Sequence, residues 1–214
     1  MLSVFERLCV ISLNLPFANW IVGRPQNWRI CIFGAVVLYL YASHHYGKRL
    51  SGNRACEKWG IHVGLPLPVR LMTALAAVTL LCDSPVGGVS MTFLDVGQGD
   101  CIVIESAGGE HFLVDGGSTS ESGIGTYTII PYLKYKGVSR LDAVFLTHLD
   151  SDHISGVMEM LEGSTAVSDK MEIGISRICI SETVIEDAAY EKLTALCAER
   201  EIPVYRLKAG DRIE

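Results

Sequence analysis

The feature that most restricts how this chain can fold is an uncharged stretch at residues 30–47, which includes the run ICIFGAVVLYLYAS. A helix that crosses a bilayer needs about 20 mostly apolar residues, with a range of about 17–25. The stretch meets this requirement and predicts a membrane-spanning helix. Residues 59–82 carry Arg70 as their single charge and predict a second span, which Pro66 and Pro68 interrupt near its start.

A third apolar stretch lies at residues 8–23 and is also uncharged. It contains Asn14, Pro16 and Asn19, so we interpret it as an interfacial or broken helix, or as the tail of a span that begins earlier. With 49% hydrophobic residues and a mean hydropathy of +0.31, the chain is apolar for a soluble protein of 214 residues. Residues 1–82 therefore predict a membrane segment with two or three apolar helices.

The charges divide the chain at the same place. Residues 1–82 hold eight Lys and Arg against two Asp and Glu, and residues 83–214 hold ten against twenty-two. The two parts thus carry +6 and −12, which add to the net charge of −6. A basic, apolar first part indicates a membrane-embedded segment, and an acidic second part indicates a solvated globular domain. The turn residues of DSPVGG place a linker at residues 83–90 and the domain at residues 91–214.

Short apolar segments separated by turn residues predict the fold of this domain. Strands are expected at MTFLDV, CIVIES, HFLVD, LDAVFLTH, ISRICIS and IPVYRL. Helices are expected at TIIPYLKYKG, at residues 154–161 and at DAAYEKLTALCAER. Hairpins followed by strand–helix–strand units are typical of an α+β or α/β sandwich in which helices cover a mixed sheet.

The seven cysteines form no CxxC pair, and we interpret them as small buried apolar residues. The alternative is a disulfide between Cys179 and Cys197, which would require an oxidising compartment.

The stretch FLTHLDSDHISG places His148, Asp150, Asp152 and His153 where a predicted central strand ends and a helix begins. Strand ends are where an α/β sheet presents its ligands. Imidazole and carboxylate groups suit Zn²⁺, Mn²⁺ or Fe²⁺, and the lack of Cys argues against a site for soft metals. Two ligand pairs would serve two ions about 3.5–4 Å apart, as in enzymes that hydrolyse phosphate esters. The alternative is a solvated acidic loop with two chance histidines, but two of only six histidines fall here.

The segment THLDSDHISG resembles the metallo-β-lactamase signature His-x-His-x-Asp-His, with Asp150 in place of the second His. Together with FLDVGQGDCIVIE and FLVDGG upstream, it resembles the ComEC family of competence DNA-uptake channel proteins. The resemblance covers most of the chain and is most specific at residues 91–156. It implies an α/β fold, the αββα metallo-β-lactamase-like sandwich, preceded by transmembrane helices of a channel.

The resemblance also implies roles for individual residues. His148 and Asp150 match the ligands of a first metal ion, and Asp152 and His153 match those of a second. Asp152 would in addition orient the attacking water, whose pKa the metal lowers toward about 7. The implied cofactors are two divalent ions, Zn or Mn.

Four residues upstream match positions near the cleft of the family. Asp115, which ends FLVD, would orient a ligand histidine. The alternative is that Asp115 only forms the turn before two glycines. Asp95, Gln98 and Asp100 in LDVGQGD would lie on a loop beside the cleft, although the two glycines of that motif are equally explained by a tight turn.

The family supplies a bridging acid and one or two histidines after this motif, but the sequence has no histidine after His153. We therefore expect the chain to hold only the first half of the sandwich and to be a middle piece of a larger protein. The missing ligands also predict that this piece does not hydrolyse DNA by itself, because a catalytic zinc takes at least three protein ligands.

Three functions follow as hypotheses. The first is a membrane-anchored hydrolase of a DNA-uptake system that cleaves DNA phosphodiester bonds. The second is a non-catalytic DNA-transport channel component, or an inactive remnant whose lactamase-like part is structural. The third, an unrelated small-molecule hydrolase, is disfavoured by the membrane segment and LDVGQGD. The acidic domain argues mildly against broad contact with DNA, although metal ions can supply the local positive charge.

The expected partners are single-stranded DNA, the membrane and other uptake proteins, at the plasma membrane of a bacterium. Lys and Arg near span ends stay in the cytoplasm. The segment 48–58 holds four of them against Glu57. The hydrolase domain is therefore expected on the external face.

Overall fold

The computed structural model describes residues 23–51, 66–81, 87–163 and 173–212, together with Arg7 and Ile21. The chain divides into two compact units, one spanning Val22–Ser84 and the other containing Pro85–Glu214. Several sequence predictions lie outside the described residues: most of the stretch 8–23, residues 52–58 of the basic segment and residues 83–86 of the linker. The predicted domain boundaries stay predictions.

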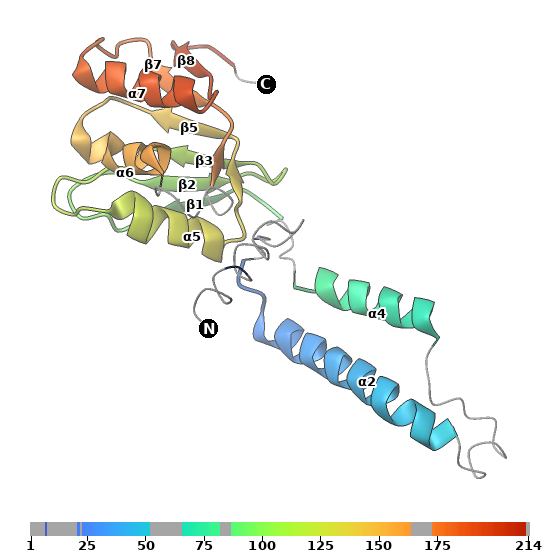
Figure 1. The fold of residues 1–214 in the computed structure, drawn as a ribbon. Coiled ribbons are helices and arrows are strands. Elements are labelled where there is room, and N and C mark those ends of the chain that lie inside the picture. Colours follow the sequence, from blue (N-terminus) through green and yellow to red (C-terminus); the bar gives the residue numbers. More distant parts are fainter. Residues whose placement is uncertain are drawn as a thin grey trace. The chain divides into compact units, whose positions relative to one another are not determined.

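The first unit contains two helices, α2 (Asn27–Ser51) and α4 (Leu67–Thr79) (Figure 1). Pro66 precedes α4 and Pro68 lies in its first turn, where the lack of an N–H is tolerated. The two prolines therefore mark the start of α4, and residues 59–65 of the predicted second span lie outside the described residues. Large apolar side chains are exposed on both helices, among them Trp28, Ile32, Leu38, Leu71, Met72 and Leu75. No helix in the described part of the chain is both long enough and apolar enough to cross a membrane.

The second unit is built on a mixed sheet with the strand order β1-β2-β3-β5-β7-β8. These strands are β1 (Ser90–Phe93), β2 (Ile102–Glu105), β3 (His111–Val114), β5 (Ala143–Leu146), β7 (Ile178–Ser181) and β8 (Val204–Leu207). The first three pair antiparallel as hairpins, and β3, β5, β7 and β8 pair parallel. Each strand overlaps a predicted one, and the predicted mixed sheet is confirmed.

Two predicted strands are each divided in the structure. Asp142 separates β4 (Arg140–Leu141) from β5, because its carboxylate accepts a hydrogen bond from the backbone N–H of His111. The backbone N–H of Asp142 in turn donates to the carbonyl of His111 at 2.8 Å. The second divided segment is ISRICIS. Its first residue, Ile175, ends β6 (Gly174–Ile175), and its last four residues form β7. Strands β4 and β6 form a separate two-stranded ladder.

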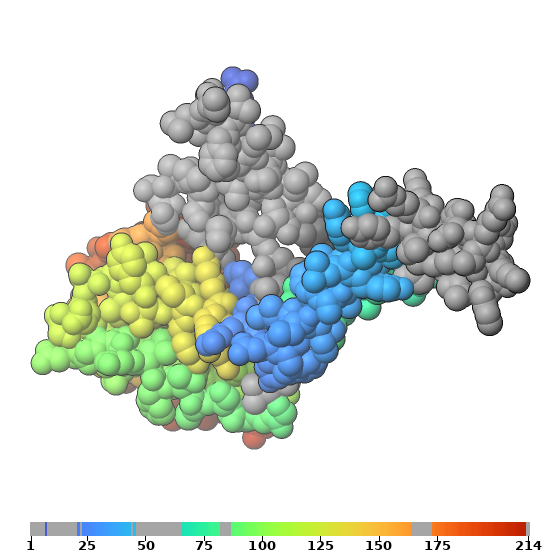
Figure 2. Space-filling view, turned by 90° about the horizontal axis from the view of Figure 1, so that it is seen from below, coloured from blue at the N-terminus to red at the C-terminus, as the bar shows by residue number. Residues whose placement is uncertain are grey.

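Three helices lie along one face of the large sheet: α5 (Ile130–Tyr135), α6 (Ser151–Glu162) and α7 (Ala188–Glu199) (Figure 1). A π-helical turn, η1 (Gly125–Ile129), runs directly into α5, so this helical segment begins earlier than predicted. In the space-filling view the atoms of η1 and α5 (yellow-green) lie beside those of β1–β3 (green) (Figure 2). The core between helices and sheet includes Val103, Leu113, Val144, Ile178, Leu133, Val157 and Leu193.

The sheet register explains why one face is buried. Val103 pairs with Leu113, Leu113 with Val144, and Val144 with Ile178, which makes one continuous apolar row under the helices. Side chains alternate between the faces of a strand. The opposite face therefore carries Met91 and Phe93 on the edge strand, exposed by 59% and 71%, and the half-buried residues Ile102, Ile104, Phe112, Val114 and Phe145.

Glu159 connects α6 to the loop that follows β3. Its carboxylate accepts hydrogen bonds from the backbone N–H groups of Gly123 at 2.9 Å, Gly125 at 2.8 Å and Thr126 at 3.2 Å. The N-terminus of η1 is thereby satisfied by a charge on the helix that begins at Ser151.

Candidate metal centre

The site lies at the carboxyl ends of two neighbouring parallel strands. Strand β3 ends at Val114 and β5 at Leu146, and the two pair in parallel register. Parallel strands present their carboxyl ends at the same edge of a sheet. Asp115, which follows β3 directly, is therefore beside the turn at residues 147–150, and α6 begins immediately after that turn. Asp152 and His153 belong to the first turn of this helix, which starts three residues earlier than the sequence predicts.

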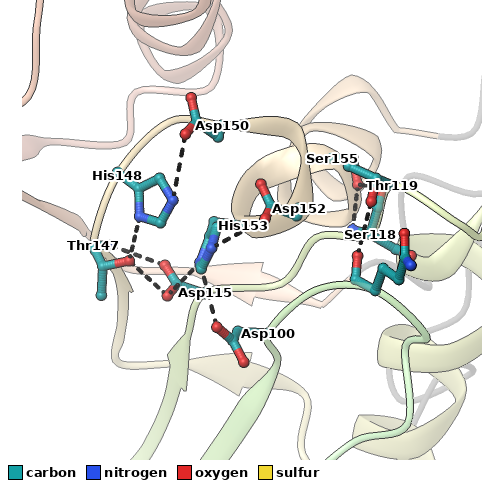
Figure 3. Close-up of polar contacts among 11 residues, drawn as sticks. Asp100, Asp115, Ser118, Thr119, Thr147, His148, Asp150, Asp152, His153 and Ser155 are labelled. Atoms are coloured by element: carbon teal, nitrogen blue, oxygen red, sulfur yellow. Dashed lines mark hydrogen bonds and ion pairs between the residues drawn. The ribbon is translucent and has the colours of Figure 1, made fainter.

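Asp115 is 3% exposed and organises the site (Figure 3). Its Oδ1 accepts a hydrogen bond from the backbone N–H of Thr147 at 2.9 Å, and its Oδ2 accepts one from the Thr147 hydroxyl at 2.8 Å. The same Oδ2 lies 3.0 Å from Nδ1 of His153. The residue also has a φ of +53°, so it forms the turn after β3 as well. The two interpretations of Asp115 from the sequence are thus compatible.

The hydrogen-bond network assigns the same tautomer to both histidines. Nδ1 of His153 faces the carboxylate of Asp115, so this nitrogen carries the proton. The Thr147 hydroxyl donates to Asp115 and lies 3.0 Å from Nδ1 of His148, from which it therefore accepts. Nε2 of each ring then keeps its lone pair, which is the form in which imidazole binds a metal.

His148, Asp152 and His153 each offer a donor atom within 4.8 Å of the others. The two imidazole rings have centroids 3.6 Å apart, and Asp152 Oδ2 lies 3.5 Å from His153 Nε2. Donor atoms bound to one ion at about 2 Å lie at most about 4 Å apart, so a small closure would bring these three onto one ion. Two imidazoles and a carboxylate suit a divalent transition metal.

Asp150 lies outside this group of three. Its side chain is 80% exposed and contacts His148, with Oδ2 at 3.5 Å from Nε2. It occupies the position before α6 without making a capping hydrogen bond. The structure thus brings His148 to Asp152 and His153 as well as to Asp150. Ligation by each of the four residues stays a prediction.

The predicted cleft residues divide into two groups. Asp100 joins the site, with Oδ2 at 3.9 Å from His153 Nδ1. Asp95 instead lines a cavity of about 330 Å³, together with Glu121 and Tyr127. Gln98 contributes its backbone, whose carbonyl accepts a hydrogen bond from the N–H of Thr119, on the neighbouring loop, at 2.8 Å.

Thr147 is the residue at this site that the sequence analysis did not single out. It connects Asp115 to His148 through its hydroxyl. The available signal was a hydroxyl residue immediately before the first histidine of the motif, at the end of a predicted strand.

No cysteine among the described residues belongs to the group of candidate metal donors. Burial, with a contribution from the charge of Asp115, raises the pKa of Cys101 to about 12, so its thiol stays protonated. Cys101, Cys179 and Cys197 are buried free thiols, which confirms the interpretation of these three as small apolar residues. Cys31 is a free thiol too but is exposed.

Comparison with known proteins gives two kinds of match. Residues 94–172 match the Metallo-beta-lactamase superfamily. The chain is 29% identical to ComE operon protein 3 of Bacillus subtilis (strain 168) over 62% of this chain and 17% of that protein. It is 38% identical to Competence protein ComA of Neisseria gonorrhoeae over 34% of this chain and 10% of that protein. The chain therefore spans less than a fifth of the length of these relatives.

Among solved structures, the chain is similar to the metallo-beta-lactamase fold protein YhfI from Bacillus subtilis. The two are 20% identical in sequence, with a TM-score of 0.33. The match covers 59% of this chain and 48% of that one.

Proposed function

We propose a function from the premise that this chain is a ComEC-like competence protein with a metallo-beta-lactamase region. In this proposal the region is a metal-dependent hydrolase that cleaves DNA during DNA uptake. The observation that carries the proposal is the group formed by His148, Asp152 and His153 over the buried carboxylate of Asp115. Such a group has no evident role in folding, because two of its three members are not buried.

The donor set fits a divalent ion. His148 and His153 would hold it through Nε2, and Asp152 through a carboxylate oxygen. Asp150 lies beside His148 and would serve a second ion, which makes the site harder than one built from three histidines and suits Mn²⁺ as well as Zn²⁺. Bound ions supply Lewis acidity and make water a stronger acid near neutral pH.

The chain's own residues perform the remaining tasks in this proposal. Asp152 orients the water that attacks phosphorus, because its carboxylate is part of the donor group and only partly buried. Asp115 and Thr147 hold the two imidazoles in the tautomer that binds metal. We assign the sheet and its helices to one half of an αββα sandwich, which the apolar second face of the sheet supports.

The proposed substrate is single-stranded DNA. The carboxylates of Asp100, Asp115, Asp150 and Asp152 lie beside the two histidines, so the site itself offers little positive charge to a phosphate backbone. The proposal therefore gives the neutralisation of phosphate to the metal ions.

We further propose that the protein acts at the bacterial plasma membrane, with the hydrolase region on the external face. The exposed apolar side chains of α2 and α4 support association with a membrane. Ser120 is exposed and provides a reporter position. A membrane-impermeant thiol reagent should label a Ser120→Cys variant on intact cells, and labelling only after lysis would contradict this orientation.

The metal centre of the proposed hydrolase is tested by calorimetric titration of the whole chain with Zn²⁺ and Mn²⁺, and cleavage of single-stranded DNA is tested in a longer protein that also supplies the later ligands of the family. We expect metal binding that His153→Ala abolishes and that His111→Ala, a change to a half-buried histidine on β3, leaves intact. No binding of either ion at micromolar concentration would contradict the proposal.

A second candidate is a non-catalytic part of the uptake channel. The observation that favours it is the exposure of Asp150, which leaves three donor atoms in one group among the described residues. Because this chain by itself is not expected to cleave DNA, the two candidates are separated in a longer protein that also supplies the later acid and histidine of the family. Metal binding without DNA cleavage in that protein would favour this candidate.

A further inference from the structure

The peptide that joins Asp152 to His153 lies directly against two glycines from other parts of the chain. A Cβ on Gly117 would lie closer than 3.0 Å to the carbonyl carbon of Asp152 and to the nitrogen of His153. A Cβ on Gly99 would lie closer than 3.0 Å to the carbonyl oxygens of Gly117 and Asp152. Three backbone segments therefore lie side by side with no side chain between them.

Hydrogen bonds join the three segments. The carbonyl of Asp152 accepts from the N–H of Asp100 at 3.1 Å, and the carbonyl of His153 accepts from the N–H of Gly116 at 2.7 Å. The N–H of Gly117 donates to the carbonyl of Asp100 at 3.2 Å. Both residues that offer metal donors from α6 thus have their carbonyls bonded to loops outside the helix.

The backbone conformation does not explain the two glycines. Gly97, in the same loop as Gly99, has a φ of +75°, which favours glycine in a turn. Neither Gly99 nor Gly117 has a positive φ, so other residues could adopt their backbone conformation. The reason for glycine at these two positions is the space that the peptide between Asp152 and His153 occupies.

A side-chain contact holds the same loop to α6 one turn further along the helix. The Ser155 hydroxyl accepts a hydrogen bond from the N–H of Ser118 at 2.9 Å and donates to the carbonyl of Ser118 at 3.2 Å. Ser155 is partly buried and follows His153 by two residues.

We propose that Gly99 and Gly117 are positioning residues of the metal centre, and that Ser155 supports them. This inference rests on the proposed function. Because glycine has no Cβ, the loop backbones can approach the helix backbone closely enough to donate hydrogen bonds to the carbonyls of Asp152 and His153. These hydrogen bonds fix the direction in which both side chains leave the helix. The LDVGQGD and DGG segments then act on the metal centre through their backbones. A shift of about 1 Å in supporting residues is enough to impair such a site.

The test compares Gly99→Ala and Gly117→Ala with Gly174→Ala in the whole chain. An added Cβ at Gly174 makes only ordinary contacts, the nearest at 3.5 Å, so this variant is the matched control. Affinities for Zn²⁺ and Co²⁺ are measured by titration, and the absorption spectrum of bound Co²⁺ reports the ligand geometry. We expect both variants to bind about 10-fold or more weakly with an altered spectrum, as other changes to groups that orient metal ligands do.

Ser155→Ala covers the case in which an added Cβ prevents folding, because this change only removes an atom. We expect it to weaken metal binding several-fold while circular dichroism stays unchanged. Wild-type affinity and spectrum in a folded Gly117→Ala, or in Ser155→Ala, would overturn the inference while the proposed hydrolase stands. A wild-type chain that binds no ion would contradict the proposed function and this inference with it.

Discussion

The carboxylate of Asp115 lies 3.0 Å from Nδ1 of His153, in a position where the carboxylate is almost fully buried. This contact decides which nitrogen of the ring carries a proton, and it couples the strand β3 to the first turn of α6. The same carboxylate reaches His148 through the hydroxyl of Thr147.

Replacing Asp115 with Asn should weaken metal binding about 10- to 100-fold, because the amide removes the negative charge that holds the proton on Nδ1 of His153. Titration with Zn²⁺ measures the effect. Asp211→Asn is the control, since Asp211 is exposed and its carboxylate accepts a hydrogen bond from the backbone N–H of Lys208, away from the candidate centre. Equal affinities for Zn²⁺ in the two variants would show that Asp115 only forms the turn after β3 and does not support metal binding.

Replacing Thr147 with Val keeps the shape of the side chain and removes the hydroxyl between Asp115 and His148. We expect weaker metal binding than in the wild type but a smaller loss than in His148→Ala. Thr147→Ser restores the hydroxyl and should restore the affinity. A loss in Thr147→Ser as large as that in Thr147→Val would mean that packing of the methyl group, and not the hydrogen bond, accounts for the effect.

Replacement of Asp150 and replacement of Asp152 should differ in their effect on the first metal ion that each chain binds, which is the most tightly bound equivalent in a titration. Asp152 shares a donor group with both histidines, whereas Asp150 is exposed and its carboxylate lies 3.5 Å from Nε2 of His148. Asp152→Ala should abolish tight binding, and Asp150→Ala should retain one tight equivalent. Asp150→His should shift the preference from Mn²⁺ toward Zn²⁺, because imidazole is the softer ligand. Loss of the tight equivalent in Asp150→Ala would contradict the grouping.

The buried thiol of Cys101 predicts how stability changes in alkali. Its pKa is raised from 9.0 to about 12 in the folded chain, so above pH 9 the unfolded chain releases a proton that the folded chain keeps. The free energy of unfolding should therefore fall as the pH rises from 9 toward 12, by up to about 1.4 kcal/mol per pH unit from this group.

Urea unfolding at several pH values checks this slope. Cys101→Ala should make the fall shallower, whereas Cys31→Ala, a change at an exposed thiol, should leave it unchanged. Cys179 and Cys197 also have raised pKa values, so part of the slope should persist. Identical slopes in wild type and Cys101→Ala would contradict the assignment.

The exposed apolar side chains of the edge strand β1 should cause self-association of the isolated chain. Phe93 lies on the edge strand β1 with 71% of its surface exposed, and exposed apolar edge strands favour pairing between molecules. Phe93→Glu should lower the apparent mass in sedimentation and change the free energy of unfolding little. The same replacement at Leu113, which is fully buried, should instead prevent folding. No change in mass for Phe93→Glu would show that this face does not mediate association.

The elements of the second unit could be predicted because their apolar residues alternate and turn residues separate them. The start of α6 was placed too late, since Asp150 makes no side-chain cap and the polar run SDH hides the first turn. The divisions at Asp142 and before Ile178 depend on a hydrogen bond from the distant His111 and on pairing with β4, which no local pattern encodes.

The candidate site was predicted in composition but not in arrangement. The motif around His148 identifies the candidate donor residues, and their imidazole and carboxylate groups indicate a divalent metal ion. The grouping of His148 with Asp152 and His153 depends on where α6 begins, and the bridge through Thr147 depends on the pairing of β3 with β5. The close approach of Gly117 to the helix is likewise invisible in a sequence, where Gly116 and Gly117 only indicate a turn.

The three backbone N–H groups that donate to Glu159 lie at the end of the loop after β3 and at the start of η1. Their common acceptor, the carboxylate of Glu159, is part of α6. These amides should therefore exchange with solvent only after the hydrogen bonds to that carboxylate break. Exchange at Gly123, Gly125 and Thr126 should therefore be slow and should proceed at one common rate, as a single cooperative opening. Slow common exchange would show that this part of the chain opens only when its contacts with α6 break.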